Sequence, residues 1–190
     1  MDRLEIFAEL LTKWNRTARL VAASTLKGLW RRHLLDSAQL MDHIPGDADK
    51  LLDVGTGGGF PGLVLAIMAA DRQPGIKFVL VDSNERKCDF LREVCRQTGT
   101  NAEIRDVRDR ELEPQRADVM TARAVAPLDG LLGIASRHLT KDGLCMFLKG
   151  KGFMTEIQLA KGHWNFGLTD LQSRSHDSGR ILLIRDLKRG

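Results

Sequence analysis

The residues from Leu51 to Gly62, LLDVGTGGGFPG, form the stretch with the clearest chemical signature, because five of these twelve residues are glycine. Glycine has no Cβ atom, so it is used where the backbone takes a conformation that other residues avoid, or where a ligand must approach the main chain closely. An apolar run precedes the glycines and another follows them. The pattern predicts a strand, a tight loop and a helix, with a nucleotide-like ligand at the loop.

Two binding patterns overlap in this loop, and their spacing alone does not separate them. A dinucleotide fingerprint, G-x-G-x-x-G with an acid twenty residues further on, is matched by Gly57, Gly59, Gly62 and Asp82. The pattern D-x-G-x-G-x-G, the loop of methyltransferases that bind S-adenosylmethionine, is matched by Asp53, Gly55, Gly57 and Gly59.

Electrostatics favours the second pattern. Asp53 ends the predicted strand beside the ligand, where its carboxylate would repel a pyrophosphate in a poorly solvated cleft. S-adenosylmethionine carries a sulfonium and an ammonium group and no phosphate, so we expect the acid to attract it. We therefore predict S-adenosylmethionine as the cofactor, with Gly55, Gly57 and Gly59 among the residues that bind it.

Acids also stand near the ends of the next two predicted strands. Asp82 ends the second strand, where a carboxylate can accept hydrogen bonds from both ribose hydroxyls. The alternative is that Asp82 or Ser83 caps the following helix. The stretch DVRDRELE, residues 106–113, follows the third strand and is expected to border the adenine, although charged runs are usually solvated surface.

The fourth predicted strand leads into ARAVAPL, residues 122–128. This stretch has neither the Asn/Asp-Pro-Pro-aromatic motif of enzymes that methylate exocyclic amines nor a Pro-Cys pair for covalent attack on a pyrimidine. It does offer Arg123 as a fixed cation near the reaction centre, which suits an electron-rich or phosphate-bearing substrate. A surface salt bridge is the alternative role for Arg123.

The order of predicted elements supports this interpretation. We expect helices in residues 1–48, which form an N-terminal extension, and an α/β core in residues 49–190. In the core, strands at 50–54, 76–82, 102–106, 117–124, 143–150 and 180–186 alternate with helices at 62–71, 84–99, 127–139 and 156–162. Such alternation is typical of a parallel, doubly wound sheet.

Composition limits the possible classes of protein. The net charge of +4 and the isoelectric point near 9.1 are compatible with a nucleic-acid partner. The three cysteines form no CxxC pair and have no histidine at metal-ligand spacing, so we predict neither a disulfide framework nor a metal site. The N-terminal residues do not resemble a signal peptide, and the longest apolar run is too short to span a bilayer. We therefore expect a soluble, cytoplasmic protein.

Basic residues supply candidate contacts for a nucleic acid. They cluster in the extension, at strand ends and in the tail, and comprise Arg16, Arg19, Lys27, Arg31, Arg32, His33, Arg123, Lys149, Lys151, Arg180, Arg185, Lys188 and Arg189. Each could equally be an ordinary surface residue. His33 could be a structural histidine, Asp36 and Ser37 could hold the second helix against the sheet, and the three tryptophans are expected in core or docking positions.

Several stretches together resemble one known family. WNRTARL (14–20), HLLDS (33–37), the glycine loop, LVDSNERKCDFL (80–91), RAVAPL (123–128) and LKG (148–150) are similar to the glucose-inhibited division protein B family. The resemblance covers nearly the whole chain. The glycine loop is common to methyltransferases, whereas the combination of HLLDS, GGGFPG and RAVAPL is much more specific.

The resemblance implies a class I S-adenosylmethionine-dependent methyltransferase with a Rossmann-like, doubly wound sheet. It implies that the protein makes N7-methylguanosine at position 527 in the 530 loop of 16S rRNA. It places cofactor contacts at Gly55, Phe60, Asp109, Arg110 and Arg123. Many members have an acid where this chain has Arg110, so that position could contact the adenine through backbone atoms.

The expected chemistry is simple. Guanine N7 has a free lone pair, so it can attack the methyl group directly, and we predict no catalytic base and no covalent intermediate. We expect 16S rRNA as the partner and a monomer. The alternatives are a methyltransferase for small molecules, a nicotinamide-dependent oxidoreductase, and an RNA-binding module with a vestigial nucleotide pocket.

Overall fold

The computed structural model describes residues 2–190, and its centre is a seven-stranded sheet in the order β3-β2-β1-β4-β5-β7-β6. The strands are β1 (Lys50–Val54), β2 (Lys77–Asp82), β3 (Glu103–Asp106), β4 (Ala117–Arg123), β5 (Leu139–Lys149), β6 (Trp164–Gln172) and β7 (Arg180–Arg189). The sequence places β1, β2 and β4 at the centre of the sheet. Their β-branched and apolar residues are buried on both faces, as the centre of a parallel sheet requires.

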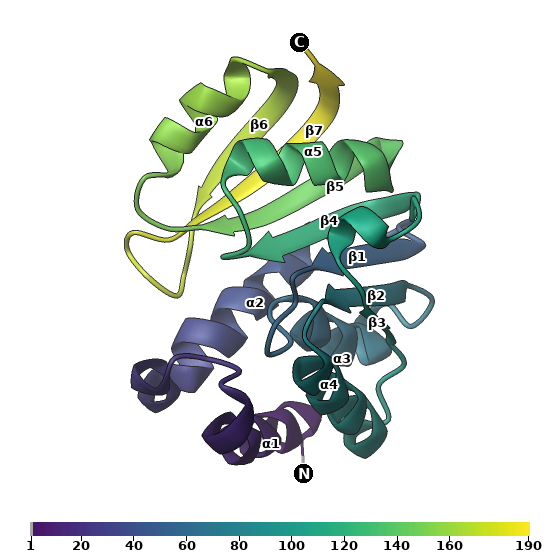
Figure 1. The fold of residues 1–190 in the computed structure, drawn as a ribbon, viewed down its shortest axis with the longest axis vertical. Coiled ribbons are helices and arrows are strands. Elements are labelled where there is room, and N and C mark those ends of the chain that lie inside the picture. Colours follow the sequence, from purple (N-terminus) through teal and green to yellow (C-terminus); the bar gives the residue numbers. More distant parts are fainter. Residues whose placement is uncertain (1) are drawn as a thin grey trace.

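Helices cover both faces of the sheet (Figure 1). One face carries α1 (Arg3–Ala18), α3 (Gly62–Arg72), α4 (Glu85–Thr98) and the rest of the extension, and the other carries α5 (Leu128–His138) and α6 (Phe153–Lys161). Along β1, Leu51 belongs to the first apolar cluster, whereas Leu52 and Val54 belong to the second. This alternation is the period-two pattern of a strand.

The doubly wound class is confirmed, with a difference at the C-terminal end. Strands β1 to β5 are parallel to one another, as predicted, whereas β7 runs antiparallel to both β5 and β6. The sequence analysis missed β6, because its burial is partial and its apolar residues are interrupted by Asn165, Gly167 and Asp170. The hairpin of β6 and β7 therefore extends the parallel sheet without a crossover helix.

The N-terminal extension is helical, as predicted, but its second part is a succession of short helical segments of different types. The chain forms the 3₁₀-helix η1 (Ala23–Gly28), the π-helix η2 (Trp30–Leu35), α2 (Asp36–Ala38) and the 3₁₀-helix η3 (Gln39–His43) in turn. The N-cap of η1 is Ala22, which makes no side-chain capping bond. The Ser37 hydroxyl donates to the His33 carbonyl at 2.7 Å, an i−4 bond that competes with regular helix geometry.

The extension packs into the same hydrophobic core as the sheet. The ring of Phe7 lies 5.3 Å from that of Phe60 and 6.1 Å from that of Phe90, and Trp14 lies 5.8 Å from Phe90. These aromatic contacts join α1 to α4 and to the glycine loop. Within residues 2–190, no helix combines the length and the apolar character that a membrane crossing needs.

Candidate functional site

Two cavities lie beyond the carboxyl ends of the strands. The first, which we call the glycine-loop cavity, has a volume of about 270 Å³. Its lining comes from the ends of β1, β2 and β3 and from the segment after β4, and consists of Val54, Gly55, Val81, Asp82, Ser83, Val107, Arg108, Asp109 and Val125. The sequence analysis placed Gly55, Asp82 and Asp109 at this edge, and the structure brings all three together there.

The glycine loop needs its glycines for distinct reasons. Gly55, Gly57 and Gly59 have φ of +64°, +56° and +94°, in the left-handed region that other residues rarely adopt. A Cβ atom on Gly55 would lie 2.5 Å from Cγ2 of Val125, so this glycine lets the segment after β4 close over the loop. A Cβ atom on Gly59 would instead meet Leu63 at 3.0 Å and Phe7 at 3.2 Å, so Gly59 makes room for the helices.

Asp82 connects the loop to the second strand. Its Oδ2 accepts from the Gly57 amide at 2.9 Å, and its Oδ1 accepts from the Asn84 amide at 3.0 Å. The alternative that Asp82 or Ser83 caps α4 is wrong, because Asn84 is the N-cap and its side chain accepts from the Lys87 amide at 3.1 Å. Asp82 therefore fixes the loop and lines the cavity with the same carboxylate.

The segment after β3 contributes Asp109 to the cavity but does not contribute the Arg110 side chain. That side chain is 69% exposed and lies 3.9 Å from Glu111. The backbone of the turn is held by Arg137 of α5, whose guanidinium donates to the Arg110 carbonyl at 2.8 Å and to the Leu112 carbonyl at 2.6 Å. Any ligand contact from Arg110 would therefore use its backbone.

Asp53 does not lie in the cavity, which corrects the electrostatic argument from the sequence. It is fully buried because the alternation of β1 turns it toward α3. There it accepts from the Gly62 amide at 3.0 Å and from the Thr121 hydroxyl at 2.7 Å. Burial raises the pKa of Asp53 to about 6, against hydrogen bonds that lower it. Asp53 thus joins β1, β4 and α3 and does not face a ligand.

The Phe60 side chain is also buried, away from the glycine-loop cavity. Its ring lies 5.0 Å from that of His33, and the Arg123 guanidinium lies 4.8 Å from its centroid. A cofactor contact at this position would come from the backbone of Phe60. The side chain packs the extension against the core.

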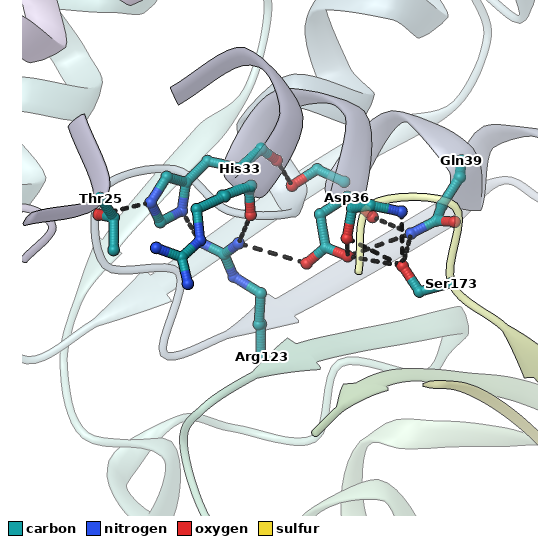
Figure 2. Close-up of polar contacts among 9 residues, drawn as sticks. Thr25, His33, Asp36, Gln39, Arg123 and Ser173 are labelled. Carbon is teal, nitrogen blue, oxygen red and sulfur yellow. Dashed lines mark hydrogen bonds and ion pairs between the residues drawn. The ribbon is translucent and has the colours of Figure 1, made fainter. Parts of the chain in front are cut away.

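Arg123 is the centre of a polar network that joins the sheet to the extension (Figure 2). Its guanidinium lies 2.9 Å from Nδ1 of His33 and 3.5 Å from Oδ2 of Asp36, and it donates to the Arg32 carbonyl at 3.3 Å. Arg123 follows Val119 and Thr121 on the face of β4 that the extension covers. Its role is therefore more than a surface salt bridge.

The network defines the protonation of His33. Burial, together with the Arg123 charge, lowers the pKa of His33 to about 4. Neutral His33 accepts from Arg123 at Nδ1, so its Nε2 carries the proton and donates to the Thr25 hydroxyl at 2.8 Å. That hydroxyl is free to accept, because it donates its own proton to the Ala22 carbonyl at 2.7 Å. His33 is a structural histidine. Burial also lowers the pKa of Arg123.

Asp36 extends this network to the loop between β6 and β7. Its Oδ1 accepts from the hydroxyls of Ser173 at 3.1 Å and Ser175 at 2.5 Å. Gln39 donates to the Ser173 hydroxyl at 2.9 Å and accepts from the Arg174 amide at 2.9 Å. As Figure 2 shows, Asp36 stands between Arg123 on one side and the loop on the other. No sequence pattern pointed to this loop.

The second cavity, which we call the β4–β5 cavity, has a volume of about 680 Å³. It is lined by Arg32 and Asp36 of the extension, residues 123–127 after β4, residues 148–150 after β5, Glu156 of α6, and the loop residues Ser175, His176, Ser178 and Gly179. Arg123 lines this cavity and not the glycine-loop cavity. Val125 lines both, so it forms part of the wall between them.

The residues that the sequence analysis missed are mainly apolar. Val54 and Val81 stand at the ends of β1 and β2, and Val107 follows β3. The position of each at a strand end was a signal that could have identified it, because ligands of doubly wound folds bind at those ends. Val125 had no such signal, because its place depends on the conformation of the segment after β4.

The glycine-loop cavity fits S-adenosylmethionine better than a dinucleotide. Asp82 and Asp109 can accept hydrogen bonds from ribose hydroxyls and an adenine amine, and the neighbouring valines can contact the flat base. A pyrophosphate would meet these two carboxylates with Arg108 as the only cation in the lining. Among residues 2–190, no group of His, Cys, Asp or Glu side chains is arranged to hold a metal ion.

Comparison with known sequences identifies a family. Residues 1–180 match the family model described as "GidB: rRNA small subunit methyltransferase G". The chain is 43% identical over 186 residues to ribosomal RNA small subunit methyltransferase G of Cereibacter sphaeroides, covering 98% of this chain and 90% of that protein. It is 45% identical over 190 residues to the protein of the same name from Paramagnetospirillum magneticum, covering 100% and 90%.

Solved structures share the fold at low sequence identity. A SAM-dependent methyltransferase from Aquifex aeolicus superposes with a TM-score of 0.62 at 14% identity, covering 92% of this chain and 97% of that one. A protein from Pyrococcus horikoshii, PH0226, superposes with a TM-score of 0.63 at 14% identity, covering 91% and 98%. The fold is that of class I S-adenosylmethionine-dependent methyltransferases.

Proposed function

The chain belongs to the GidB family of rRNA small subunit methyltransferase G, and we propose that it transfers the methyl group of S-adenosylmethionine to N7 of a guanosine in 16S rRNA. The proposed target is position 527, in the 530 loop. The relatives from Cereibacter sphaeroides and Paramagnetospirillum magneticum carry this methyltransferase name and match nearly the whole chain. We also propose that the protein acts as a monomer in the cytoplasm.

The adjacency of the two cavities is the observation that carries this proposal. A methyltransferase must hold its donor and its acceptor in line, with the reacting atoms in contact. Val125 lines both the glycine-loop cavity and the β4–β5 cavity, so ligands in the two would meet at this residue. We assign the cofactor to the first cavity and the target guanine to the second.

The protein's part in the reaction is alignment. S-adenosylmethionine, when bound, supplies a methyl group that a nucleophile can attack directly. Guanine N7 presents its lone pair in the plane of the ring and loses no proton, so the site needs no general base. Asp82 and Asp109 orient the donor, and the lining of the β4–β5 cavity holds the base. Proximity and orientation can lower such a barrier by roughly 7–11 kcal/mol in ideal cases.

The extension offers a surface for the RNA. A groove of about 1110 Å³ runs between α1 and the η1–η2 segment, and its cations are Lys13, Arg16, Lys27 and Arg31. Trp30 lines the groove and is 53% exposed, so it is not the core or docking residue that we expected. An exposed indole beside cations suits stacking on an unpaired base. Arg32 leads from this surface to the β4–β5 cavity.

The Lys149 ammonium is not available to bind an RNA phosphate, which corrects its place among the candidate contacts. Its ammonium donates to the Ala126 carbonyl at 2.8 Å and to Glu156 at 2.7 Å, and its side chain is 9% exposed. The phosphate-binding role is therefore assigned to the cations of the groove. If one of these cations binds a phosphate, its replacement by methionine should reduce the slope of RNA affinity against salt concentration by about one unit.

Nucleoside mapping tests the proposal. The purified protein is incubated with S-adenosylmethionine and either 16S rRNA or small-subunit particles from cells that lack the gene. The RNA is then digested and analysed by mass spectrometry. We expect 7-methylguanosine at one site in at least one of the two substrates. Methylation of a different atom or a different RNA would overturn the proposal, as would a thermal shift with NAD and none with S-adenosylmethionine.

A further inference from the structure

We call residues 124–127 the wall, because Val125 in this segment lines both cavities, and regular secondary structure does not hold it. Pairing of β4 with β5 ends at Arg123, which is opposite Leu148, and α5 begins only at Leu128. Ala124 has a φ of +56°, in the left-handed region that a residue with a Cβ atom adopts only under constraint. Something outside the segment must therefore fix its path.

Two side chains fasten the wall at its C-terminal end. Lys149 donates to the Ala126 carbonyl at 2.8 Å, and Oε2 of Glu156 accepts from the Leu128 amide at 2.7 Å. The same Oε2 accepts from the Lys149 ammonium at 2.7 Å, so the pair grips the backbone on both sides of Pro127. Pro127 is the N-cap of α5 and has no side-chain donor or acceptor. The Glu156 carboxylate therefore takes the place of an N-cap side chain by accepting from the Leu128 amide.

Lys149 and Glu156 belong to β5 and α6, which lie outside the wall. Lys149 is the last residue of β5 and faces the same side of the sheet as Phe147, where α5 and α6 pack. Glu156 lies in the first turn of α6, which follows a turn at Gly152 with a φ of +90°. The position of the wall is thus set by β5 and α6, and both side chains also line the β4–β5 cavity.

We propose that Lys149 and Glu156 are positioning residues for methyl transfer, which hold Val125 and its neighbours at the distance that aligns acceptor and donor. The inference rests on the proposed function for its kinetic part. It predicts a specific division of effects, because neither residue lines the glycine-loop cavity. Loss of the pair should slow the transfer step while the affinity for S-adenosylmethionine stays nearly unchanged.

The test compares three variants with the wild type: Lys149→Met, Glu156→Gln, and the double variant Lys149→Met/Glu156→Met. The exposed Lys161→Met in α6 is the control. In the double variant, two apolar side chains replace the ion pair, an exchange that often leaves the folded state as stable as before. It nevertheless removes both bonds to the wall, so it separates positioning from a general effect on stability.

Two readouts are measured on each variant. The first is hydrogen exchange of the Leu128 amide, and the second is the single-turnover rate of methyl transfer to the RNA, with the dissociation constants of S-adenosylmethionine and RNA measured in parallel. We expect the double variant to unfold at the wild-type denaturant midpoint, to exchange the Leu128 amide at least about tenfold faster, and to transfer methyl about 10–100-fold more slowly. Its dissociation constant for S-adenosylmethionine should change less than about threefold, because neither residue lines the glycine-loop cavity.

The outcomes separate the two proposals. A double variant with wild-type transfer rate, or with unchanged exchange at Leu128, overturns the positioning role. If the transfer rate falls in the single variants but not in the double variant, which keeps wild-type stability, the positioning role is also overturned. The pair would then be a stabilising contact only. If the wild type itself methylates neither RNA substrate, the proposed function fails, and exchange at Leu128 alone decides whether the pair fixes the wall.

Discussion

The two cavities are built in different ways, although they share a wall. The glycine-loop cavity takes all but Val125 of its lining from the ends of three neighbouring strands, within residues 54–109. The β4–β5 cavity draws on the extension, two strand ends, α6 and the β6–β7 loop. Hydrogen bonds to the backbone fix the first, such as that from Gly57 to Asp82. Bonds between side chains of distant segments fix the second, around Arg123 and Asp36.

This difference teaches that the donor site is formed by the sheet and its loops, whereas the acceptor site forms only when the extension and the β6–β7 loop pack against the sheet. The hydrogen bonds that shape the glycine loop lie within the loop or join it to β2. The β4–β5 cavity depends on Asp36 of the extension, which binds both Arg123 of β4 and Ser175 of the β6–β7 loop. A substitution in the network should therefore affect the acceptor side far more than the donor side.

The largest effect is expected for Arg123→Met. The change removes the guanidinium that donates to the buried His33 and pairs with the half-buried Asp36, and such a loss costs about 3–5 kcal/mol of stability. Urea unfolding should show this cost, and limited proteolysis should cut the extension faster. The control Arg105→Met removes an exposed ion pair on β3 and should change stability by less than about 0.5 kcal/mol. Equal effects of the two variants would contradict the docking role.

The second prediction concerns pH and the buried Asp53. Its pKa is raised from 3.8 to about 6 in the folded state, so the folded protein binds more protons than the unfolded chain between these values. Stability from this group is full below pH 4 and declines as pH rises through 6, by about 3 kcal/mol. Asp53→Asn should remove that decline. Parallel pH profiles of the urea midpoint in the two proteins would refute the assignment.

Gly62→Ala should destabilise the fold beneath the glycine loop by about 2 kcal/mol. A Cβ atom there would lie 2.5 Å from Cβ of Asp53 and 2.5 Å from Cδ2 of Leu80, and both neighbours are buried. Gly75→Ala is the matched control, because no atom lies within 4 Å of its added Cβ. The measurement is again urea unfolding. A Gly62→Ala protein as stable as Gly75→Ala would mean that α3 and β1 can separate at little cost.

Asp82→Asn should affect the donor side alone. The amide keeps one oxygen for Gly57 but loses the charge that favours ribose hydroxyls, so we expect S-adenosylmethionine to bind about tenfold more weakly, equivalent to about 1.4 kcal/mol. Calorimetry measures this change, and RNA binding by gel shift should be unaltered. If RNA affinity fell as much as cofactor affinity, the two cavities would not be independent.

The smallest effect is expected for His33, and its pH dependence has the opposite sign to that of Asp53. Its pKa falls from 6.5 to about 4 on folding, so its contribution is complete above pH 6.5 and is lost as pH falls toward 4. After solvent screening, this amounts to about 1 kcal/mol. His33→Gln cannot be protonated, so proteolysis of its extension should not accelerate between pH 6.5 and 5. Wild-type-like acceleration in that variant would refute the role of His33.

The sequence was sufficient for the order of elements from β1 to α6 and for part of the donor site. Gly55, Asp82 and the stretch 106–113 could be placed together because each stands at or just beyond the end of a predicted parallel strand, and such ends meet at one edge; the family resemblance singled out Asp109 in that stretch. The same pattern misled at Asp53, since the acid ends the strand but points to the face that α3 covers. Counting residues in steps of two along β1 would have shown this orientation.

The acceptor side could not be predicted in this way. Arg123 was recognised as a fixed cation, but its partners lie some ninety residues earlier in the chain, and the β6–β7 loop gave no signal at all. The strand β6 itself was missed, so its loop had no predicted place. Trp30 was expected to be buried and is exposed, whereas Lys149 was expected to be exposed and its side chain is largely buried. The exposure of both side chains depends on neighbours that no local pattern contains.

What the sequence by itself determined is the donor-binding half of this protein. Strand periodicity and glycine conformation act over a few residues, and together they fix a loop at the sheet edge. Only the tertiary structure decided which groups face the acceptor, because hydrogen bonds such as that from Ser175 to Asp36 join residues far apart in the chain. Such contacts form only after the sheet, the extension and the hairpin have packed.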